Sequence, residues 1–460
     1  MRRTSIRRAA LFGAIALPIV PALAQEGGVL LTFGVNQRFE YESNPDLDVS
    51  GGESRTQAVT RLSFGLRSET QTEKLRFDAS TALRLSETDS DGFQSDVDNP
   101  RLGFSYSRDG SDSSLTFSAN YRQDQVEFLR PLEDFRNEDG VIELPEDFSA
   151  LQGSGTRRSY GGTLRMDFGK EAPLGFGFVA GLSQIDYTDV SDADLNDIRR
   201  ENLGATVRLR FSDTTRGRIA VNYNRFTEED TAQTDRQTEA IRFGVTHDLT
   251  SATTLDASIG YSTVDTEEFG VTRTTSKPIY SFGLAQDMPN GSLTVDLDAR
   301  TESDGTWTSL SFGRVYELAN GGLSGRIGLV DPAGVDPELE GEVNWNRELP
   351  SGQINARLSR AVSSQTDDQT RISSALSLGY DHGINDVSGI GVDLSLAKVT
   401  ETNENTVDRT DLSAFYRHAL TDDWDLNVGA SWTERDEETV GKADSQSVFL
   451  TIGRRFTFRP

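Results

Sequence analysis

The chain has 460 residues, with 46 Lys and Arg against 73 Asp and Glu, no cysteine and a formal net charge of −27. Apart from one stretch near the N-terminus, no run approaches the roughly 20 apolar residues of a membrane-spanning helix, which excludes a polytopic helical membrane protein. The lack of cysteine excludes disulfides and thiolate metal sites, and the acidic charge makes nucleic acid a poor partner because its phosphates would be repelled.

The N-terminus has the three parts of a secretory signal peptide. Four arginines precede a short apolar stretch at residues 9–20, and Ala22-Leu23-Ala24 has the small residues of a signal peptidase site. We predict that residues 1–24 are removed and that residues 25–460 form the exported domain. A single membrane anchor is the alternative, but an anchor would need a longer apolar span and a polar stop-transfer flank.

Two-residue alternation of apolar and polar side chains dominates the rest of the chain. It is clear at 75–85, where odd positions are mostly apolar and even positions mostly polar, and it recurs at 115–122, 203–211 and 293–298. Only a β-strand presents such a period as two distinct faces. We therefore predict an all-β chain with one strand for each alternating run.

The connections between these runs alternate in length. Short turns with hairpin residues lie at 109–112, 212–214, 289–291, 319–321, 350–352 and 421–423. Longer, mostly acidic connections lie at 43–54, 88–97, 129–155, 189–197, 229–235, 331–336 and 437–444. Short turns on one rim and long loops on the other are typical of outer-membrane barrels. We predict a transmembrane antiparallel up-and-down β-barrel in a Gram-negative outer membrane, with about 22 strands in a range of about 18 to 22.

An acidic stretch after the run at 75–85 has oxygen ligands spaced nearly as in a calcium loop. The candidate ligands are Glu87, Asp89, Asp91 and Asp98, with Gly92 at the sharp turn. The match is imperfect at the first and last ligand positions, and no helix flanks it. A solvated acidic loop is therefore the favoured interpretation, with Ca²⁺ as the alternative.

The longest connection, 129–155, is predicted to be the third extracellular loop. It combines many charges with apolar residues at Phe135, Ile142, Leu144 and Phe148, which a merely solvated loop would not need. We predict that the loop folds into or over the lumen and constricts it, as a long third loop does in general porins. Its predicted constriction residues are Glu133, Asp134, Arg136, Glu138 and Asp139. Packing of the loop on the outer rim is the alternative.

In a membrane barrel the apolar face of each strand meets lipid and the polar face lines the lumen. The predicted lumen-lining residues are Arg76, Arg84, Arg122, Arg165, Arg208, Arg210, Asp296, Asp298, Glu340 and Glu342. Because both signs of charge occur, these residues either set the selectivity of a pore or only brace its wall. A slip of one residue in register would exchange the two faces.

The last alternating run carries a recognisable motif. Residues 451–458 read polar-x-Gly-x-x-aromatic-x-aromatic, with Gly453, Phe456 and Phe458 at the defining positions. This motif resembles the C-terminal signal by which the barrel assembly machinery recognises outer-membrane barrels, and the resemblance implies that machinery as a partner. The chain departs from the usual form because Arg459 and Pro460 follow the final aromatic residue.

The first alternating run adds a family resemblance. Residues 33–46 form an amphipathic strand that ends in Tyr41-x-x-Asn44, which looks like the start of the porin-like barrels of bacterial outer membranes. Some of that group are thought to serve exopolysaccharide export. TonB-dependent transporters are the competitor at this strand count, and they carry a plug domain before the first strand. About four residues separate the predicted cleavage site from the first strand, so we expect no plug domain.

These observations favour a porin-like channel for passive passage of polar solutes or a polysaccharide. The alternative is a structural or interaction barrel, closed to solutes, whose acidic loops bind cations, lipopolysaccharide or a partner. We expect contacts with outer-membrane lipid and lipopolysaccharide, a polysaccharide or an export partner, and no nucleic acid. Catalysis has little support, because His247, His382 and His418 lie near strand ends and no Ser, His and Asp set accompanies them. We therefore expect no enzyme, no metal centre and no cofactor besides calcium.

Overall fold

The computed structural model describes residues 28–88, 92–126, 132–136, 141–144, 146–149, 151, 155–190, 195–364, 370–401 and 406–460. The signal peptide predicted at residues 1–24 lies outside this part of the chain and stays a prediction. Within the described residues, no helix combines the length and the apolar character that crossing a membrane requires.

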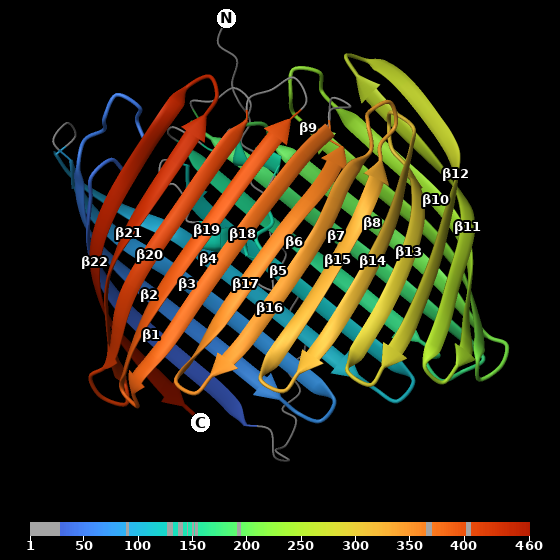
Figure 1. The fold of residues 1–460 in the computed structure, drawn as a ribbon, viewed down its shortest axis with the longest axis horizontal. Coiled ribbons are helices and arrows are strands. Elements are labelled where there is room, and N and C mark those ends of the chain that lie inside the picture. The colour runs from blue at the N-terminus through green and yellow to red at the C-terminus, as the bar shows by residue number, and fades with distance from the viewer. Residues whose placement is uncertain are drawn as a thin grey trace, which may run out of the picture.

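The described chain forms 22 strands that follow one another in space as in sequence (Figure 1). They are β1 (Val29–Glu42), β2 (Arg55–Glu69), β3 (Glu73–Thr88), β4 (Gly92–Asp109), β5 (Ser113–Gln125), β6 (Thr156–Phe168), β7 (Leu174–Thr188), β8 (Ile198–Arg210), β9 (Thr215–Glu228), β10 (Asp235–Thr250), β11 (Thr253–Glu268), β12 (Val271–Met288), β13 (Gly291–Thr301), β14 (Thr306–Leu318), β15 (Gly321–Asp331), β16 (Glu338–Leu349), β17 (Gly352–Ser364), β18 (Thr370–Asn385), β19 (Ser388–Glu401), β20 (Val407–Ala419), β21 (Trp424–Glu437) and β22 (Gly441–Phe458). Two short 3-10 helices, η1 (Leu132–Phe135) and η2 (Glu146–Phe148), lie between β5 and β6.

The sheet closes on itself because its first and last strands pair. Each strand is antiparallel to the next, and β1 is antiparallel to β22 from Leu31 opposite Phe458 to Glu42 opposite Ser447. Every strand therefore has two partners, so the barrel has no free edge strand in the membrane. The start of β1 and the end of β22 lie at the same rim (Figure 1).

The connections differ between the two rims. At the rim that holds both strand ends, short turns such as 110–112, 289–290 and 319–320 join neighbouring strands. Gly291 and Gly321, which begin the strands after two of these turns, have φ angles of 128° and 140°, a region that favours glycine. The longer connections, including 43–54 and 126–155, lie at the other rim.

Two predicted connections are wrong in length. The connection predicted at 437–444 is only 438–440, because β21 ends at Glu437 and β22 begins at Gly441. The stretch 88–97 was expected to be a loop, but β4 already begins at Gly92. Phe93 lies opposite Glu87 of β3 and Val97 lies opposite Leu83, so this acidic segment completes a hairpin with β3. Pairing with the neighbouring strand outweighs a local composition that favours a turn.

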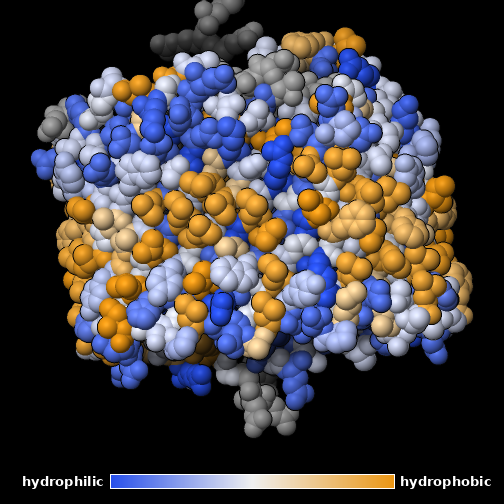
Figure 2. All heavy atoms as spheres, in the orientation of Figure 1, coloured by the Kyte–Doolittle hydropathy of each residue, from blue (hydrophilic) through white to orange (hydrophobic). Residues whose placement is uncertain are grey.

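The outer face of the wall is apolar around its middle. Leu62, Leu83, Phe117, Phe178 and Ile259 are exposed there, and Figure 2 shows a band of apolar side chains between two more polar zones. Aromatic rings also meet across neighbouring strands, as Phe33 and Phe64 do with centroids 5.0 Å apart. Such a band is the surface that the hydrocarbon region of a bilayer covers.

Candidate functional site

All ten residues predicted to line the lumen lie on the inward face of the wall, opposite the apolar band. Directly opposed residues of antiparallel strands point to the same side, and the register places Arg122 beside Ser159 and Arg208 beside Arg218. The ten residues are Arg76, Arg84, Arg122, Arg165, Arg208, Arg210, Asp296, Asp298, Glu340 and Glu342. What they select, if they select a ligand, stays a prediction.

Several of these residues have partners on the wall itself. Arg122 donates to Asp124 at 2.6 Å and Arg208 to Asp167 at 2.5 Å, while Arg84, which is buried, donates to Gln57 at 2.5 Å. Charged side chains therefore brace the inside of the barrel.

An arginine followed two residues later by an acid is a repeated device of the wall. A strand places residues i and i+2 on the same face, so the two charges meet without help from another strand. The pairs are Arg38–Glu40, Arg76–Asp78, Arg122–Asp124, Arg199–Glu201, Arg300–Glu302, Arg409–Asp411 and Arg435–Glu437. All except Arg199–Glu201 lie on the inward face.

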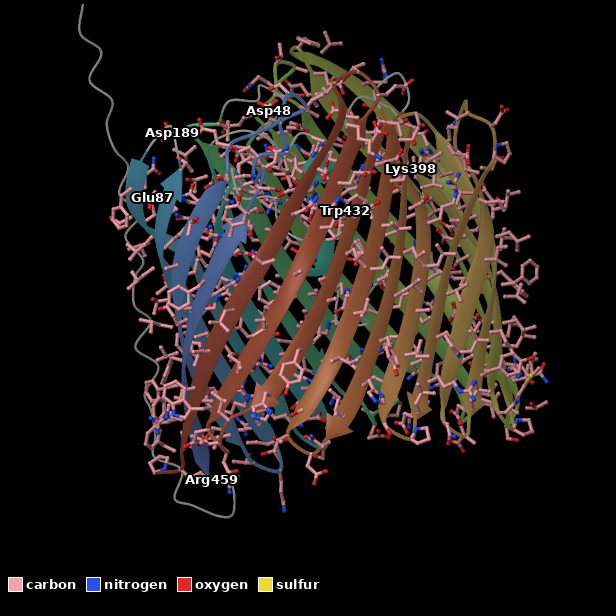
Figure 3. All side chains as sticks on the ribbon, turned by 60° about the vertical axis from the view of Figure 1, so that its left-hand side comes forward. Asp48, Glu87, Asp189, Lys398, Trp432 and Arg459 are labelled. Atoms are coloured by element: carbon pink, nitrogen blue, oxygen red, sulfur yellow. The ribbon has the colours of Figure 1, made fainter. Side chains whose placement is uncertain are left out.

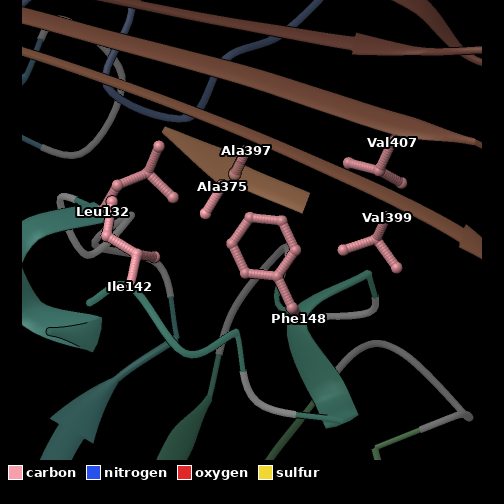
Figure 4. Packing of buried hydrophobic residues seen from close by; sticks show 7 residues of the cluster. All are labelled: Leu132, Ile142, Phe148, Ala375, Ala397, Val399 and Val407. Carbon is pink, nitrogen blue, oxygen red and sulfur yellow. The ribbon is translucent and has the colours of Figure 1, made fainter. Parts of the chain in front are cut away.

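The segment between β5 and β6 enters the barrel and reaches the far wall. We call residues 126–155 the inward loop. Its Leu132, Ile142 and Phe148 are buried, with exposed fractions of 0%, 4% and 2%. Figure 4 shows these side chains facing Ala375 of β18, Ala397 and Val399 of β19, and Val407 of β20. The lumen is therefore crossed by an apolar contact that joins two parts of the wall far apart in the sequence.

Polar contacts hold the inward loop to the same wall. The Leu132 N–H donates to Asp411 Oδ2 at 2.6 Å, Arg371 donates to the Leu144 carbonyl at 3.2 Å, and Arg435 donates to the Ser149 carbonyl at 2.7 Å. These bonds satisfy main-chain groups that burial would otherwise leave without partners. The loop is thus docked at main-chain positions by side chains of β18, β20 and β21.

The wall beneath the loop contains strongly buried ion pairs. Arg371 and Glu401 lie 3.1 Å apart and both side chains are 4% exposed. On the loop itself, Asp147 accepts from Arg157 of β6 at 2.7 Å. Removing one partner of such a pair leaves a buried charge uncompensated, which is strongly destabilising. Substitution of either partner in these pairs is therefore expected to lower the free energy of unfolding of the barrel with its loop docked.

The predicted constriction residues are only partly described. Arg136 is half-buried and forms an isolated bridge with Ile142 of the same loop, and its charge acts on Asp393 of β19. Glu133 and Asp134 belong to η1, but their side chains lie outside the described part, as do Glu138 and Asp139 entirely. The constriction that these five residues would form stays a prediction.

The remaining predicted sites have the following positions. Glu87 lies near the end of β3 at the rim of the long loops (Figure 3), whereas Asp89 and Asp91 lie outside the described residues and Asp98 does so with its side chain. Calcium binding therefore stays a prediction.

The predicted assembly motif lies in β22. There Gly453 lies opposite Asn36, and Phe456 and Phe458 lie opposite Phe33 and Leu31 of β1. The predicted assembly motif thus forms part of the closing seam, and its recognition by assembly machinery stays a prediction.

Two carboxylates outside the strands differ in their electrostatic surroundings. Burial raises the pKa of Asp197, and the negative charge of Asp186 raises it further. Hydrogen bonds from the hydroxyl and the N–H of Ser50 lower the pKa of Asp48. Asp48 lies at the rim of the long loops in Figure 3, and Asp197 ends the connection 189–197 at the same rim. The two carboxylates therefore respond differently to pH.

Sequence reasoning missed the residues that receive the inward loop. Arg371, Glu401, Asp411 and Arg435 were not singled out, because their partners on the loop are more than 200 residues away. The repeated arginine and acid spacing would have pointed to Arg409 and Asp411 and to Arg435 and Glu437 as inward pairs. No local feature of the sequence would have identified Arg371.

No protein-family model and no curated protein sequence matches the chain. Solved structures do match it. The FrpB iron transporter from Neisseria meningitidis has a TM-score of 0.54 and 11% identity, covering 94% of this chain and 82% of that one. The ferric-catecholate import receptor Fiu from E. coli has a TM-score of 0.55 and 9% identity, with coverage of 94% and 82%. The ferric enterobactin receptor PfeA from Pseudomonas aeruginosa has a TM-score of 0.54 and 9% identity, with coverage of 93% and 81%. At such identities the likeness establishes the fold.

These comparisons correct two predictions. The 22 antiparallel strands fit the expected barrel, but the expectation of a barrel class without a plug domain is wrong, because the matching barrels are TonB-dependent receptors, which have one. The residues that the structure describes form no such domain inside the barrel. A barrel of 22 strands encloses a wide lumen that such transporters fill with chain, and here the inward loop occupies part of it.

The predicted porin-like channel for passive passage of polar solutes or a polysaccharide is also wrong. The solved barrels of this architecture are transport receptors for iron and ferric chelates, neither passive porins nor enzymes. The comparison likewise leaves no support for the structural barrel that was its alternative. Together, the closed sheet, the apolar outer band and the match to receptors of the Gram-negative outer membrane carry one conclusion: the chain is a bacterial outer-membrane β-barrel.

Proposed function

We propose that this barrel imports a ligand across the outer membrane by gated passage. The observation that carries the proposal is the inward loop, which crosses the lumen and docks on β18 to β21. The similarity in fold to an iron transporter and to an import receptor supports import as the direction of transport. Passage past a docked segment requires that segment to move, so the proposal is one of gating rather than of free diffusion.

The docking contacts favour a closed resting state. Three buried apolar side chains and hydrogen bonds to three main-chain groups hold the loop. Each buried apolar side chain contributes roughly 1.5–3 kcal/mol, and each hydrogen bond to a charged group about 1.5–3 kcal/mol. These contributions oppose the entropy of a long loop, so release requires either a bound ligand that favours the open position or energy from elsewhere.

Single-channel conductance tests the gate. The variant Leu132→Ser, Ile142→Ser, Phe148→Ser removes the apolar docking contact, and we expect its conductance in planar bilayers to be larger and steadier than that of the wild-type barrel. Leu47→Ser is the matched control, because Leu47 is a buried residue of another loop, 43–54, and its conductance should equal the wild type. Large, steady steps from the wild-type barrel, unchanged by the triple substitution, would contradict gating.

Uptake by whole cells tests the energy requirement. Iron chelates are the first ligands to try, because the solved barrels of this fold are named for iron and ferric chelates. We expect uptake of a ferric catecholate complex by cells that produce the barrel, and loss of that uptake when a protonophore collapses the membrane potential. Uptake that is insensitive to the protonophore and rises in proportion to concentration would indicate passive flow instead.

A further inference from the structure

We infer that the inner wall of β6 to β10 holds a binding site for a hydroxylated carboxylate of the size of a sugar acid. The inference rests on the proposed function in one respect, because such a ligand must be able to reach the lumen. It is carried by a cavity of about 360 Å³ on this wall, near the lower end of the range of about 300–1,000 Å³ that is common for ligand pockets.

Two neighbouring rungs of the sheet form the floor of the cavity. In the rung nearer the long loops, Ser183 of β7, Arg200 of β8, Phe226 of β9 and Arg236 of β10 lie side by side. In the next rung Thr163, Gly181, Asn202, Asn224 and Thr238 lie in the same order from β6 to β10. All of these residues occupy the inward face of the wall, and all line the cavity.

The chemistry of the first rung fits an anion on a ring. Arg200 lies over the Phe226 ring at 4.9 Å from its centroid, and Arg236 is the next residue on the other side of the ring. With strands about 4.8 Å apart, the two guanidinium-bearing residues start about 10 Å from each other across an aromatic surface. Guanidinium groups bind carboxylates with paired, charge-assisted hydrogen bonds, and the Phe226 ring beneath Arg200 orients one of the two guanidinium groups.

The second rung adds groups that recognise hydroxyls. Asn202 and Asn224 are directly opposed on neighbouring strands, and each amide presents both a donor and an acceptor. Thr163 and Thr238 place a hydroxyl at either end of the row. A site that combines two arginines, two amides and hydroxyls discriminates by charge and by hydroxyl pattern, which a purely bracing wall would not require.

Glycine provides the space. A methyl group placed on Gly181 would lie 2.0 Å from Asn202 Oδ1, so the Asn202 side chain rests where a larger residue at 181 would project. None of the described residues that line the cavity belongs to the inward loop, and the described part of the loop docks on the far wall, on β18 to β21. The cavity therefore lies on a different part of the wall from the one that the described residues of the loop contact.

Among the described residues, the two rungs that form the cavity floor carry two inward arginines and no inward acid. Glu228 is the inward carboxylate one rung nearer the long loops, and it accepts from Asn196 at 3.2 Å. The other acids close in sequence, Glu201 and Asp235, pair with Arg199 and Arg225, which point outward. Toward the opposite rim, Arg208, Arg218 and Arg242 also face the lumen, but they pair with the inward carboxylates of Asp167, Asp256 and Asp298. The charge recognition in this inference therefore depends on Arg200 and Arg236, which line the cavity themselves.

Isothermal titration calorimetry on the purified, detergent-solubilised barrel tests the site. The probes are D-galacturonate, D-galactose as the same ring without the carboxylate, and inorganic phosphate as an anion without the ring. We expect galacturonate to bind at least about tenfold more tightly than either comparator, the difference that one charge-assisted hydrogen bond supplies. Galactose or phosphate binding as tightly as galacturonate would overturn the assigned ligand class.

Substitutions locate the binding. Arg200→Gln combined with Arg236→Gln should weaken galacturonate binding about tenfold or more, and Gly181→Leu, which keeps both arginines, should abolish it by filling the cavity. Arg199→Gln is the matched control, because Arg199 is adjacent in sequence but points outward. Its affinity should equal that of the wild type. Unchanged affinity in both the double variant and Gly181→Leu, with folding verified by heat-modifiable mobility, would refute the site.

These outcomes separate the site from the gate. Binding in detergent needs no transport, so galacturonate binding that depends on Arg200 and Arg236 would stand even if release of the inward loop left conductance unchanged. Conversely, a gate confirmed by conductance together with no galacturonate binding would leave the proposed function intact and remove only the assigned ligand class.

Discussion

The strength of a charged pair in this barrel depends on its burial. Arg371 and Glu401 are both 4% exposed beneath the inward loop, whereas Lys398 and Asp408, on neighbouring strands, are 54% and 49% exposed. Exposed pairs are screened by solvent and contribute little, while a buried charge that loses its partner keeps its full desolvation cost. An ion pair buried on the inward face therefore matters more for stability than an exposed pair on the outward face.

Substitution of Arg371 tests this contrast. Arg371→Ala should lower the free energy of unfolding by about 3–5 kcal/mol, because Glu401 would be left buried without its ion pair. Lys398→Ala should cost less than about 1 kcal/mol. Urea titration of the barrel in lipid vesicles, followed by tryptophan fluorescence, measures both, and equal losses for the two variants would show that burial does not set the strength of these pairs.

The pH dependence of Asp197 gives a second prediction at the same scale. Because burial, with the charge of Asp186 added, raises its pKa in the folded barrel, ionisation of Asp197 destabilises the fold. The penalty is absent below the unfolded pKa of about 3.9 and is complete once the pH exceeds the raised folded value. Asp197→Asn keeps an oxygen for the Tyr187 N–H, which lies 2.6 Å from Asp197 Oδ1. The variant should melt at a higher temperature than the wild type at pH 7 and at the same temperature at pH 3.

The barrel is built from successive hairpins, and it is closed by one seam, the pairing of β1 with β22. Phe456 and Phe458 pack on the outward side of that seam, and Phe458 and Phe33 have ring centroids 6.0 Å apart. The motif predicted as an assembly signal is therefore also a structural contact. The predicted recognition and the structural contact can be separated, because recognition would act only in the cell, whereas the contact persists in a refolded protein.

The variant Phe456→Ser, Phe458→Ser tests the seam. We expect a lower folded fraction after refolding into detergent, because β1 and β22 lose their aromatic contacts at the rim. Heat-modifiable mobility on gels measures that fraction. Phe211→Ser is the control, since Phe211 is an exposed aromatic residue next to a turn away from the seam. Normal refolding combined with poor assembly in cells would assign the motif to recognition alone.

The sequence predicted elements well where one strand and its turn decide the structure. The alternation at 75–85 lies inside β3, and the turn at 319–321 joins β14 to β15. It failed at 88–97, where pairing with β3 outweighs a turn-like composition, and at 437–444, half of which belongs to β22. The wall partners of the inward loop could not be predicted at all, because the contact from Leu132 to Asp411 spans 279 residues and depends on the closure of the entire sheet.

At the scale of the molecule, the absence of cysteine allows the proposed gate to be locked. Phe148 and Val399 face each other in the apolar cluster between the loop and β19 (Figure 4), and the native chain has no thiol to interfere. A disulfide between Phe148→Cys and Val399→Cys should hold the loop in its docked position and stop ligand uptake. Reduction should restore uptake, and uptake that persists in the oxidised variant would show that the loop need not move.

The placement of both strand ends at one rim has a consequence for chain connectivity. Leu31 and Phe458 are neighbours across the seam, so a short peptide could join the end of β22 to the start of β1 and turn the seam into an ordinary hairpin. New termini could then be opened at the two-residue turn between β12 and β13, at the same rim, since exposed turns tolerate circular permutation. The order in which the strands are synthesised is therefore separable from the order in which they surround the lumen.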